Sequence, residues 1–427
     1  MNVYLNENQM KKNFREKNII TQLLKKGVCI PCPESVEIGP DIDSEMISGE
    51  GVVIHAGCKI YGAKTLIMSN VVLGYEAPVT IYNCQLGRNV RLNGGFFYES
   101  CFLEGAQMGS GAQIREACLL EEGARGGHTV GLKQTILFPY VTLGSLINLC
   151  DCLIAGGTDE KNHSEVGSSY IHFNYTPNQD KATASLAGNV PEGVMVNKPP
   201  IFLGGQGGIV GPVRIGFGTV VAAGTVVRND LLKENIIHLD HTYRTRSINF
   251  FPGLYNNIKR IITLNTIYIA NIIALRRWYK DVRLRFVNNN PMEITLLEGA
   301  LDKLEKAISE RIKRLGEVAN RMPESIEIYT RITSSWASES TLRKKKAFYE
   351  RWPEINQVFI DSLGYEGDRS QKEAFLNIIE RYISRKAGNY LQIIKGLTET
   401  ESRSGTEWLQ GLINKITNQV WKKLPGF

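Results

Sequence analysis

The 427-residue chain lacks an uninterrupted apolar segment long enough to cross a bilayer. Its longest apolar-rich run, residues 261–275, is 15 residues long and contains Asn265 and Asn271, whereas a spanning helix needs about 20 residues. Residues 1–26 are polar and charged and lack the apolar core of a secretory signal, so we expect a cytoplasmic protein. With 43% hydrophobic and 22% charged residues, the chain is too apolar to be wholly disordered.

Two residue types are missing from opposite parts of the chain. The part after residue 231 has no cysteine, because all eight lie earlier, and the part before residue 278 has no tryptophan, because all five lie later. Eight cysteines without a secretory signal favour a reducing compartment and free thiols. The asymmetry predicts two differently built parts, with a boundary near residues 230–250.

The first part repeats itself with a period of 17 residues and then with a period of six. Such periods indicate a solenoid, in which each repeat is one structural unit. The 17-residue step connects Cys84, Cys101, Cys118, Thr135 and Cys152, and two residues later Leu86, Leu103, Leu120, Leu137 and Ile154. The six-residue step connects Leu203, Ile209, Ile215, Val221 and Val227.

Six residues make one short strand and a corner, so three such units make one triangular coil. Aliphatic residues then point inward and stack at the strand spacing of about 4.8 Å, and the cysteine column is expected to be an interior stack of small apolar thiols. We predict a β-solenoid over residues 36–230, preceded by a helical or extended segment over residues 1–35. The main excursion from the coils is expected at Asp159–Pro200.

After residue 250 the pattern becomes helical. We predict basic amphipathic connector helices over residues 231–290 and an α-helical domain over residues 291–427, with helices at Ala374–Ile394 and Trp408–Leu424 and with Pro353 ending a helix. One apolar face is expected near the start of this domain, because its spacing is typical of an amphipathic helix. That face comprises Leu297, Leu301, Leu304, Ile308, Ile312 and Leu315.

The net positive charge of the chain is confined to one segment. The net charge is +7, and residues 244–290 carry nine Lys or Arg against one Asp, or +8. We therefore expect no nucleic-acid partner. The segment has two interpretations: residues 244–285 contact an anionic membrane surface, or a helix packs across the open end of the solenoid with its basic side chains solvated.

Several short motifs stand out between residues 100 and 230: Ala112–Arg115, Glu122–Ala124, Val130–Lys133, Leu149–Ile154, Val166–Ser169, Phe173–Tyr175, Leu203–Gly205 and Ala222–Val227. These motifs resemble the acetyltransferase half of the bifunctional N-acetylglucosamine-1-phosphate uridyltransferase/glucosamine-1-phosphate acetyltransferase family. This resemblance implies a left-handed parallel β-helix, a homotrimer with sites between subunits, and acetyl-CoA or another acyl-CoA as acyl donor. The uridyltransferase half has no counterpart among the roughly 35 residues before the first coil.

The resemblance implies a role for each matching residue. Arg115 and Lys133 would bind the phosphate of a sugar phosphate or nucleotide sugar, and their spacing of 18 residues places them on neighbouring coils. Asn174 and Tyr175 would lie beside the sugar and the thioester. The remaining implied contacts are substrate contacts at Asn148, Glu165 and Lys181, and pantetheine contacts at Gly205, Ala222 and Ala223.

The position of the family's catalytic histidine is Ser145 in this chain. A serine cannot accept a proton near neutral pH without a partner. His163 is our candidate for the replacement base, with His172 as a second choice, and Asn174 would assist catalysis. A non-catalytic nucleotide-sugar-binding or trimeric scaffold protein is the alternative.

We expect no metal at the site. The γ-class carbonic anhydrase, another hexapeptide-helix enzyme, needs three histidines with two of them five residues apart, and no pair among the six histidines has that spacing. The sequence therefore favours an acyl-CoA-dependent acyltransferase, and specifically an N-acetyltransferase of a phosphorylated or nucleotide-linked amino sugar.

Overall fold

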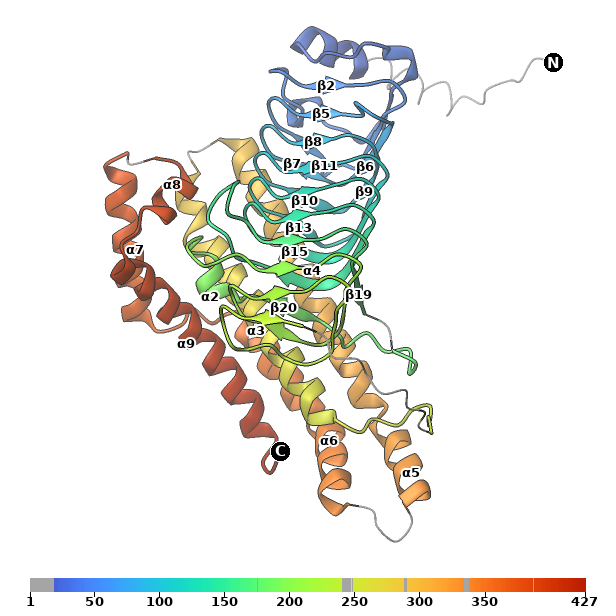
Figure 1. Ribbon diagram of the computed structural model, residues 1–427. Coiled ribbons are helices and arrows are strands. Elements are labelled where there is room, and N and C mark those ends of the chain that lie inside the picture. Colours follow the sequence, from blue (N-terminus) through green and yellow to red (C-terminus); the bar gives the residue numbers. More distant parts are fainter. Residues whose placement is uncertain are drawn as a thin grey trace, which may run out of the picture.

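The computed structural model describes residues 19–174, 176–239, 247, 249–287, 290–333, 338–386 and 388–427. Its first part is a solenoid of parallel strands that runs from residue 37 to residue 238, and helices lie along one side of it (Figure 1). The predicted fold class, a β-solenoid followed by an all-α region, is confirmed.

Each coil of the solenoid contributes short strands to three flat faces. The helices pack on one of these faces. One of the other two, here called the open face, contains β1 Glu37–Ile38, β3 Lys59–Tyr61, β6 Val79–Tyr82, β9 Gly95–Tyr98, β12 Ala112–Ile114, the first halves of β15 Val130–Leu137 and β17 Ile147–Ile154, β19 Ile171–Phe173, β22 Gly208–Val210 and β25 Val226–Val227. The covered face contains β4 Leu66–Ile67, β7 Gln85–Leu86, β10 Ser100–Phe102, β13 Cys118–Leu120, the second halves of β15 and β17, β20 Ser185–Ala187 and β23 Arg214–Ile215. The ten-stranded face contains β2 Val53–Ile54, β5 Val72–Leu73, β8 Arg91–Leu92, β11 Gln107–Met108, β14 Arg125–Gly126, β16 Thr142–Leu143, β18 Glu165–Val166, β21 Phe202–Leu203, β24 Val220–Val221 and β26 Ile237–His238.

The interior of the solenoid is built from columns of equivalent residues, one from each coil. Parallel pairing aligns these residues, so each packs on its neighbours one strand spacing away. Tight corners require left-handed backbone at many positions, including Ala117 with φ 58° and Asp151 with φ 58°. On the open face the inward column is Ile38, Ile60, Ile81, Phe97, Ile114, Leu132, Leu149, His172, Ile209 and Val227.

The predicted cysteine column is right for three thiols and wrong for one. Cys84 faces Ser100, with 3.4 Å between Sγ and Oγ, and Ser100 pairs with Cys118. The step is thus 16 residues and then 18, and only the average is 17. Cys101 moves into the next column, where its thiol donates to the carbonyl oxygen of Leu296 on the helical side.

The predicted excursion Asp159–Pro200 is not one continuous loop. β18, β19 and β20 lie inside it and continue the three faces. The chain leaves the coils at separate corners, and one of these departures contains the short helix α2 Val190–Gly193, capped by Asn189. A period of 17 could not show these strands, because the inserted residues change the spacing between them.

The helices of the second part begin at capping side chains. Asn257 caps the first long helix, Asn290 caps the second, and Thr398 and Glu401 form a capping box at the last. The short 3-10 helix η1 Pro33–Ser35 precedes the coils, and a second one, η2 Ser44–Met46, lies between β1 and β2. The later elements are α3 Ile258–Asp281, η3 Arg283–Phe286, α4 Pro291–Asn320, α5 Met322–Thr333, α6 Glu339–Ser362, α7 Arg369–Ser384, α8 Tyr390–Lys395 and α9 Glu399–Lys423.

Two details of the predicted helices are wrong. The stretch Ala374–Ile394 is two helices, because α7 ends at Ser384 and α8 begins at Tyr390. Pro353 lies inside α6 and does not end it. The amphipathic face of α4 is confirmed, since Leu297, Leu304, Ile308 and Leu315 are buried and Leu301 and Ile312 are partly buried against the core.

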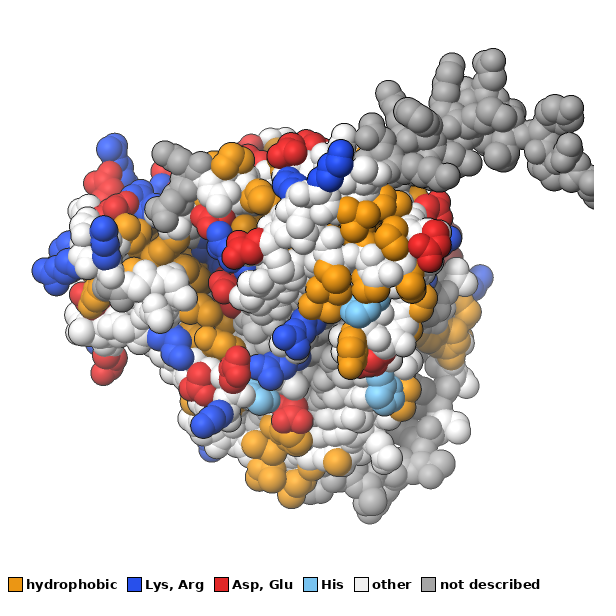
Figure 2. All heavy atoms as spheres, turned by 90° about the horizontal axis from the view of Figure 1, so that it is seen from above, with side chains coloured by type: hydrophobic (Ala, Val, Ile, Leu, Met, Phe, Trp, Pro, Cys, Tyr) orange, Lys and Arg blue, Asp and Glu red, His pale blue; other side chains and the backbone are white. Residues whose placement is uncertain are grey.

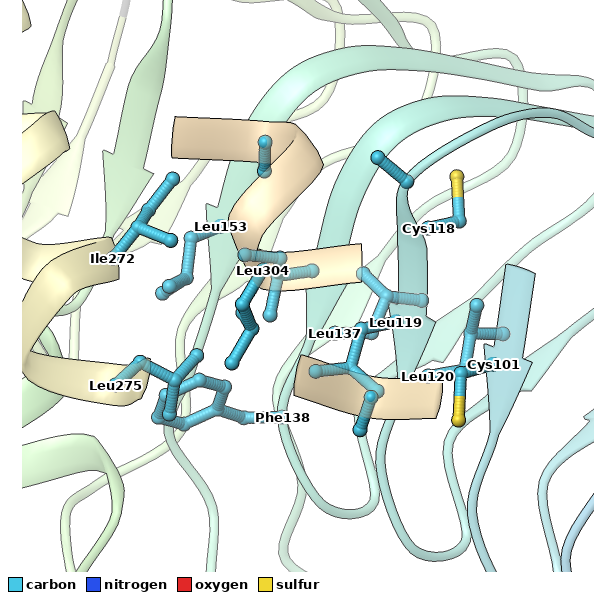
Figure 3. Packing of buried hydrophobic residues seen from close by; sticks show 14 of the residues in the cluster. Cys101, Cys118, Leu119, Leu120, Leu137, Phe138, Leu153, Ile272, Leu275 and Leu304 are labelled. Carbon is cyan, nitrogen blue, oxygen red and sulfur yellow. The ribbon is translucent and has the colours of Figure 1, made fainter. Parts of the chain in front are cut away.

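The covered face continues the hydrophobic core into the helical part. Its outward column is buried because α4 packs against β4, β7, β10 and β13, and α3 packs against β20. Leu153 lies near Ile272 of α3 and Leu304 of α4 (Figure 3), and all three side chains are fully buried. The column is Gln85, Cys101, Leu119, Ile136, Leu153 and Leu186.

The basic connector lies along the side of the solenoid and not across its open end. Arg260 near the start of α3 donates to the carbonyl oxygen of Arg228, and Arg283 after its end pairs with Glu122 on an earlier coil. The expected solvated side chains are largely ion-paired: Arg260, Arg276, Arg277, Arg283 and Arg285 all have carboxylate partners. Arg244 and Arg246 lie outside the described residues. Charged side chains of both signs are spread over the helices at the left of Figure 2.

Among the described residues, one helical stretch, Ile258–Phe286, is long and apolar enough to cross a membrane by length and composition alone. It is longer than the apolar run in the sequence, because the helix continues through flanking polar residues. Of its most apolar window, 72% is buried against the rest of the protein. It therefore has the character of a core helix, and nothing in its packing favours the membrane interpretation.

Candidate functional site

The open face has a hollow of about 440 Å³ between neighbouring coils. It exists because Gly131 stands in an outward column between Gln113 and Asn148. A Cβ added to Gly131 would lie 3.7 Å from the nearest atom, which is an ordinary contact distance. A side chain would therefore fit there, and its absence leaves the space open. The side chains and glycine that matter here are Gln113, Arg115, Gly131, Lys133, Asn148 and Cys150.

Arg115 and Lys133 both line this hollow. Arg115 follows β12, and Lys133 lies one coil later within β15. Lys133 Nζ forms an ion pair of 2.6 Å with Glu116. Partial burial alone would raise the pKa of the Glu116 carboxyl. The hydrogen bond from Lys133 and the charges of Lys133 and Arg115 outweigh this effect, so the pKa is lowered. The two cations therefore act on the same small region.

Cys150 lines the hollow, and the charge of a third cation, Lys181, acts on its thiol. Burial, together with the charge of Asp151, raises the pKa of its thiol to about 11. The charges of Lys133, Lys181 and Arg115 oppose this rise. The charge of Lys181, which belongs to the loop after β19, thus acts on the Cys150 thiol. Cys150 stays a neutral thiol near neutral pH and is not a nucleophile.

Asn174 and its surroundings are held by the helical part. The Asn174 amide donates to Asp151 Oδ2 at 3.0 Å, and Asp151 pairs with Arg311 of α4 at 2.8 Å. Asp151 and Arg311 are both buried, so each charge requires the other. Arg311 also donates to the carbonyl oxygen of Lys181. Tyr175 lies outside the described residues.

Ser145 lies at the corner between the ten-stranded face and the open face. Equivalent residues of successive coils form a line here that we call the serine edge. Behind it a ladder of glycines lets the coils approach closely: a Cβ on Gly144 would lie 2.7 Å from Ser168 N, and one on Gly204 would lie 2.3 Å from Ala223 N. The serine edge consists of Ser110, His128, Ser145, Ser168, Gly205 and Ala223.

The candidate pantetheine residues are therefore on the same corner as Ser145. Gly205 and Ala223 belong to the serine edge, and Ala222 occupies the glycine-ladder position of the last such coil. The edge adjoins the hollow, because Gly111 and Thr129, which follow Ser110 and His128, line it. An extended ligand along this edge would meet main chain and small side chains.

His163 and Glu165 lie away from the hollow. His163 precedes β18 at the corner between the covered and ten-stranded faces, and its Nδ1 is 2.8 Å from the carbonyl oxygen of Glu160. Its Nε2 is 3.9 Å from Glu165, which is on the ten-stranded face. Within one chain His163 cannot reach a ligand held by Arg115 and Lys133, so its role as a base stays a prediction that needs a second chain.

His172 is an interior residue. Its ring lies between the carbonyl oxygen of Cys150 and Ser185 Oγ, which is 2.8 Å from Nε2. Burial lowers the pKa of His172 to about 4, against the opposing effect of the nearby Asp151 charge. The second-choice base is thus buried and does not face the hollow.

Gln113, Gly131, Cys150 and His128 did not stand out in the sequence as site residues. Gln113, Gly131 and Asn148 are 18 and 17 residues apart, so the coil period would have placed the first two beside Asn148. Cys150 is two residues after Asn148 and therefore on the same side of its strand. His128 carries no motif, and only the alignment of the coils places it.

The chain is similar to curated proteins that are each called a bifunctional protein GlmU. It is 28% identical over 219 residues to the protein of Oleidesulfovibrio alaskensis and 27% identical over 219 residues to that of Thermotoga petrophila, which covers 50% of this chain and 42% of each relative. The protein of Nitratidesulfovibrio vulgaris strain DP4 is 29% identical over 215 residues, 49% of this chain and 40% of the relative. No family model matches the chain.

The matches thus span about two fifths of the length of those relatives. Together with the solenoid they confirm the resemblance of the first half of the chain to the acetyltransferase half of the bifunctional family. They agree with a left-handed β-helix of the hexapeptide-repeat type.

Proposed function

We propose that this protein is an acyl-CoA-dependent acyltransferase that acts on a sugar phosphate or a nucleotide-linked amino sugar. The observation that supports this most is that Arg115 and Lys133 line one hollow that adjoins the serine edge. An anion held by both cations would lie beside the corner where the GlmU-like family carries its catalytic residue. The coarser statement, an acetyltransferase or nucleotide-sugar-related function, follows from the similarity to GlmU proteins.

Each residue of the hollow has a defined task in this proposal. Arg115 binds a phosphate with a fork of N–H donors, and Lys133 adds a point charge once it shares or leaves Glu116. Lys181 adds a third positive charge. The amides of Asn148 and Gln113 offer donors and acceptors for sugar hydroxyl groups. Asn174 stays bonded to Asp151 and holds the far end of the hollow in place.

The serine edge fits the acyl donor. Acetyl-CoA supplies an acyl thioester, which is the activated form of the group to be transferred. Gly205, Ala222 and Ala223 leave the backbone accessible along the corner, because larger side chains at the ladder positions would strike the next coil. Free backbone N–H groups near the thioester carbonyl would stabilise the oxyanion. We further propose a cytoplasmic homotrimer with sites between subunits, on the likeness to the family, which sedimentation analysis tests directly.

A non-catalytic protein that binds a nucleotide sugar, or a trimeric scaffold, is the second candidate. Ser145 at the position of the family's histidine favours it. Both candidates use the cations of the hollow for binding, but only the enzyme forms an acetylated product.

The two candidates separate in one set of measurements. Titration calorimetry with glucosamine 1-phosphate and with a uridine-diphosphate amino sugar is compared between wild type and Arg115→Ala/Lys133→Ala. The matched control, Lys59→Ala/Arg91→Ala, removes two cations outside the hollow. We expect at least a tenfold loss of affinity in the first double variant only. Unchanged affinity there would overturn the proposed acceptor site.

Product formation is then followed by mass spectrometry after addition of acetyl-CoA. Acetylated sugar made by wild type and not by Arg115→Ala/Lys133→Ala supports the enzyme. Binding without any product supports the scaffold.

A further inference from the structure

The corner that carries Ser145 also carries an exposed histidine one coil earlier. Backbone hydrogen bonds fix the alignment: Leu146 N donates to the carbonyl oxygen of His128 at 3.0 Å, and Thr129 N donates to that of Ser110 at 2.8 Å. His128 and Ser145 are therefore equivalent positions on adjacent coils. Neighbouring coils are about one strand spacing, ~4.8 Å, apart.

His128 adjoins both the hollow and Ser145. Thr129, the next residue, lines the hollow, and its left-handed backbone, with φ 57°, turns the chain at the corner. On the other side, a Cβ on Gly127 would lie 2.6 Å from Ser145 Oγ. The Ser145 hydroxyl is thus directed at the coil that carries His128. The ring is exposed to solvent and to an incoming ligand.

A carboxylate lies on the other side of His128. Glu76 accepts a hydrogen bond from Asn93 at 2.8 Å. Hydrogen bonds from Ser110 are the main cause that lowers the pKa of Glu76, and the charge of His128 lowers it too. His128 therefore has the Ser145 hydroxyl on one side, and the Glu76 carboxylate lies beyond Ser110 on the other.

We propose that His128 is the general base of the acyl transfer, displaced by one coil from the position that Ser145 occupies. This inference rests on the proposed acyltransferase function. The acceptor amine forms a bond to the acyl carbon, and the carbon–sulfur bond of the thioester breaks. The amine proton moves to an imidazole nitrogen of His128, directly or through the Ser145 hydroxyl, and then to the departing thiolate, so that an amide and a thiol are formed.

The other described histidines are less well placed. His172 is buried in the solenoid interior, His163 is on a different corner, and His55 and His238 are on coils near the two ends of the solenoid. His128 is the one among the described histidines that shares a corner with Ser145 and adjoins the cationic hollow.

The test compares His128→Asn with His55→Asn, which changes a histidine several coils away on the same side of the solenoid. We expect His128→Asn to lower kcat by about a hundredfold or more, with affinities for acetyl-CoA and glucosamine 1-phosphate unchanged in calorimetry. The acid limb of the pH profile of kcat/KM should disappear.

A rescue experiment distinguishes a base from a structural residue. Adding Ser145→His to His128→Asn restores a histidine one coil away, and we expect kcat and the acid limb to return in part. Full activity of His128→Asn would overturn the inference while leaving the acyltransferase proposal intact. Binding without product in wild type would overturn both, and in that case Ser145→His alone is the variant that could create activity.

Discussion

The covered face and the open face of the solenoid have similar interiors and opposite exteriors. The inward columns of both faces are buried and mostly apolar, with thiols on the covered face and the ring of His172 on the open face. The outward column of the covered face, from Gln85 to Leu186, is buried beneath α3 and α4. Outward residues of the open face include Phe96, which is 37% exposed, and Ile171, which is 40% exposed, beside the polar Gln113 and Asn148.

This difference shows which residues specify which property. The inward columns specify the coil, since any face needs them. The outward columns decide what binds to a face: a continuous apolar column selects the protein's own helices, and an interrupted column with Gly131 and two cations leaves room for a small ligand. Substitutions at matched outward positions of the two faces therefore test this difference.

The largest effect is expected from Leu153→Ala on the covered face. Leu153 is fully buried between the solenoid and the helices, so the variant loses buried apolar area and leaves a cavity, at a cost of about 4 kcal/mol. Ile171→Ala is the matched change on the open face and should cost less than about 1 kcal/mol. Urea unfolding measures both, and equal losses would mean that the open face is also covered, as in an assembly of several chains.

An intermediate effect is expected from pH, through His172. Its pKa is about 4 in the folded protein and about 6.5 when unfolded. The folded state thus binds fewer protons, and the contribution of neutral His172 is present above pH 6.5 and lost as the pH falls toward 4. We expect a loss of roughly 3 kcal/mol from this group.

The measurement is the difference in free energy of unfolding between wild type and His172→Gln at each pH. The difference isolates His172 from Glu121, whose pKa burial raises to about 7 and which changes stability in the opposite direction. A difference that does not change between pH 7 and pH 4.5 would contradict the buried position of the ring.

The smallest effect on stability is expected at Gly131. A Cβ would fit at this position without a clash, and the backbone there is not left-handed. Gly131→Ala should therefore raise the free energy of unfolding by up to about 1 kcal/mol, because it reduces the conformational entropy of the unfolded chain. Gly131→Leu should fill the hollow and weaken sugar-phosphate binding at least tenfold with little change in unfolding. Calorimetry and urea unfolding on the same two variants test this, and tight binding by Gly131→Leu would place the ligand elsewhere.

The coil period predicted the solenoid because interior columns must repeat to stack. It did not predict the shift at Cys101, because steps of 16 and 18 residues average to 17 and leave the pattern intact. It also did not predict which face α3 and α4 cover. In the sequence, the outward apolar column of Leu119, Ile136 and Leu153 looks the same as the apolar columns of the interior. Alignment in space is needed to distinguish inward from outward apolar columns.

The candidate site was predictable to a similar extent. The 18-residue spacing of Arg115 and Lys133 placed them on adjacent coils, and both line the hollow. The charge of Lys181 acts on Cys150 from a loop that Arg311 holds in place. The coil period could not predict this, because loop residues do not follow the period. His128 has no distinguishing neighbours in the sequence, and it gains its position only from the hydrogen bond between Leu146 and His128.

The glycine ladder fixes distances along the axis of the solenoid. Because each rung of the ladder is a glycine or, at the last coil, Ala222, the distance from Ala223 to His128 depends on the stacking of main chain and not on rotamers. A linear ligand on this edge is measured out in whole coils, so a reactive group at its end arrives at one height along the solenoid. Insertion or deletion of a single coil between these residues would move that height by one strand spacing, ~4.8 Å, and separate the reactive group from its base.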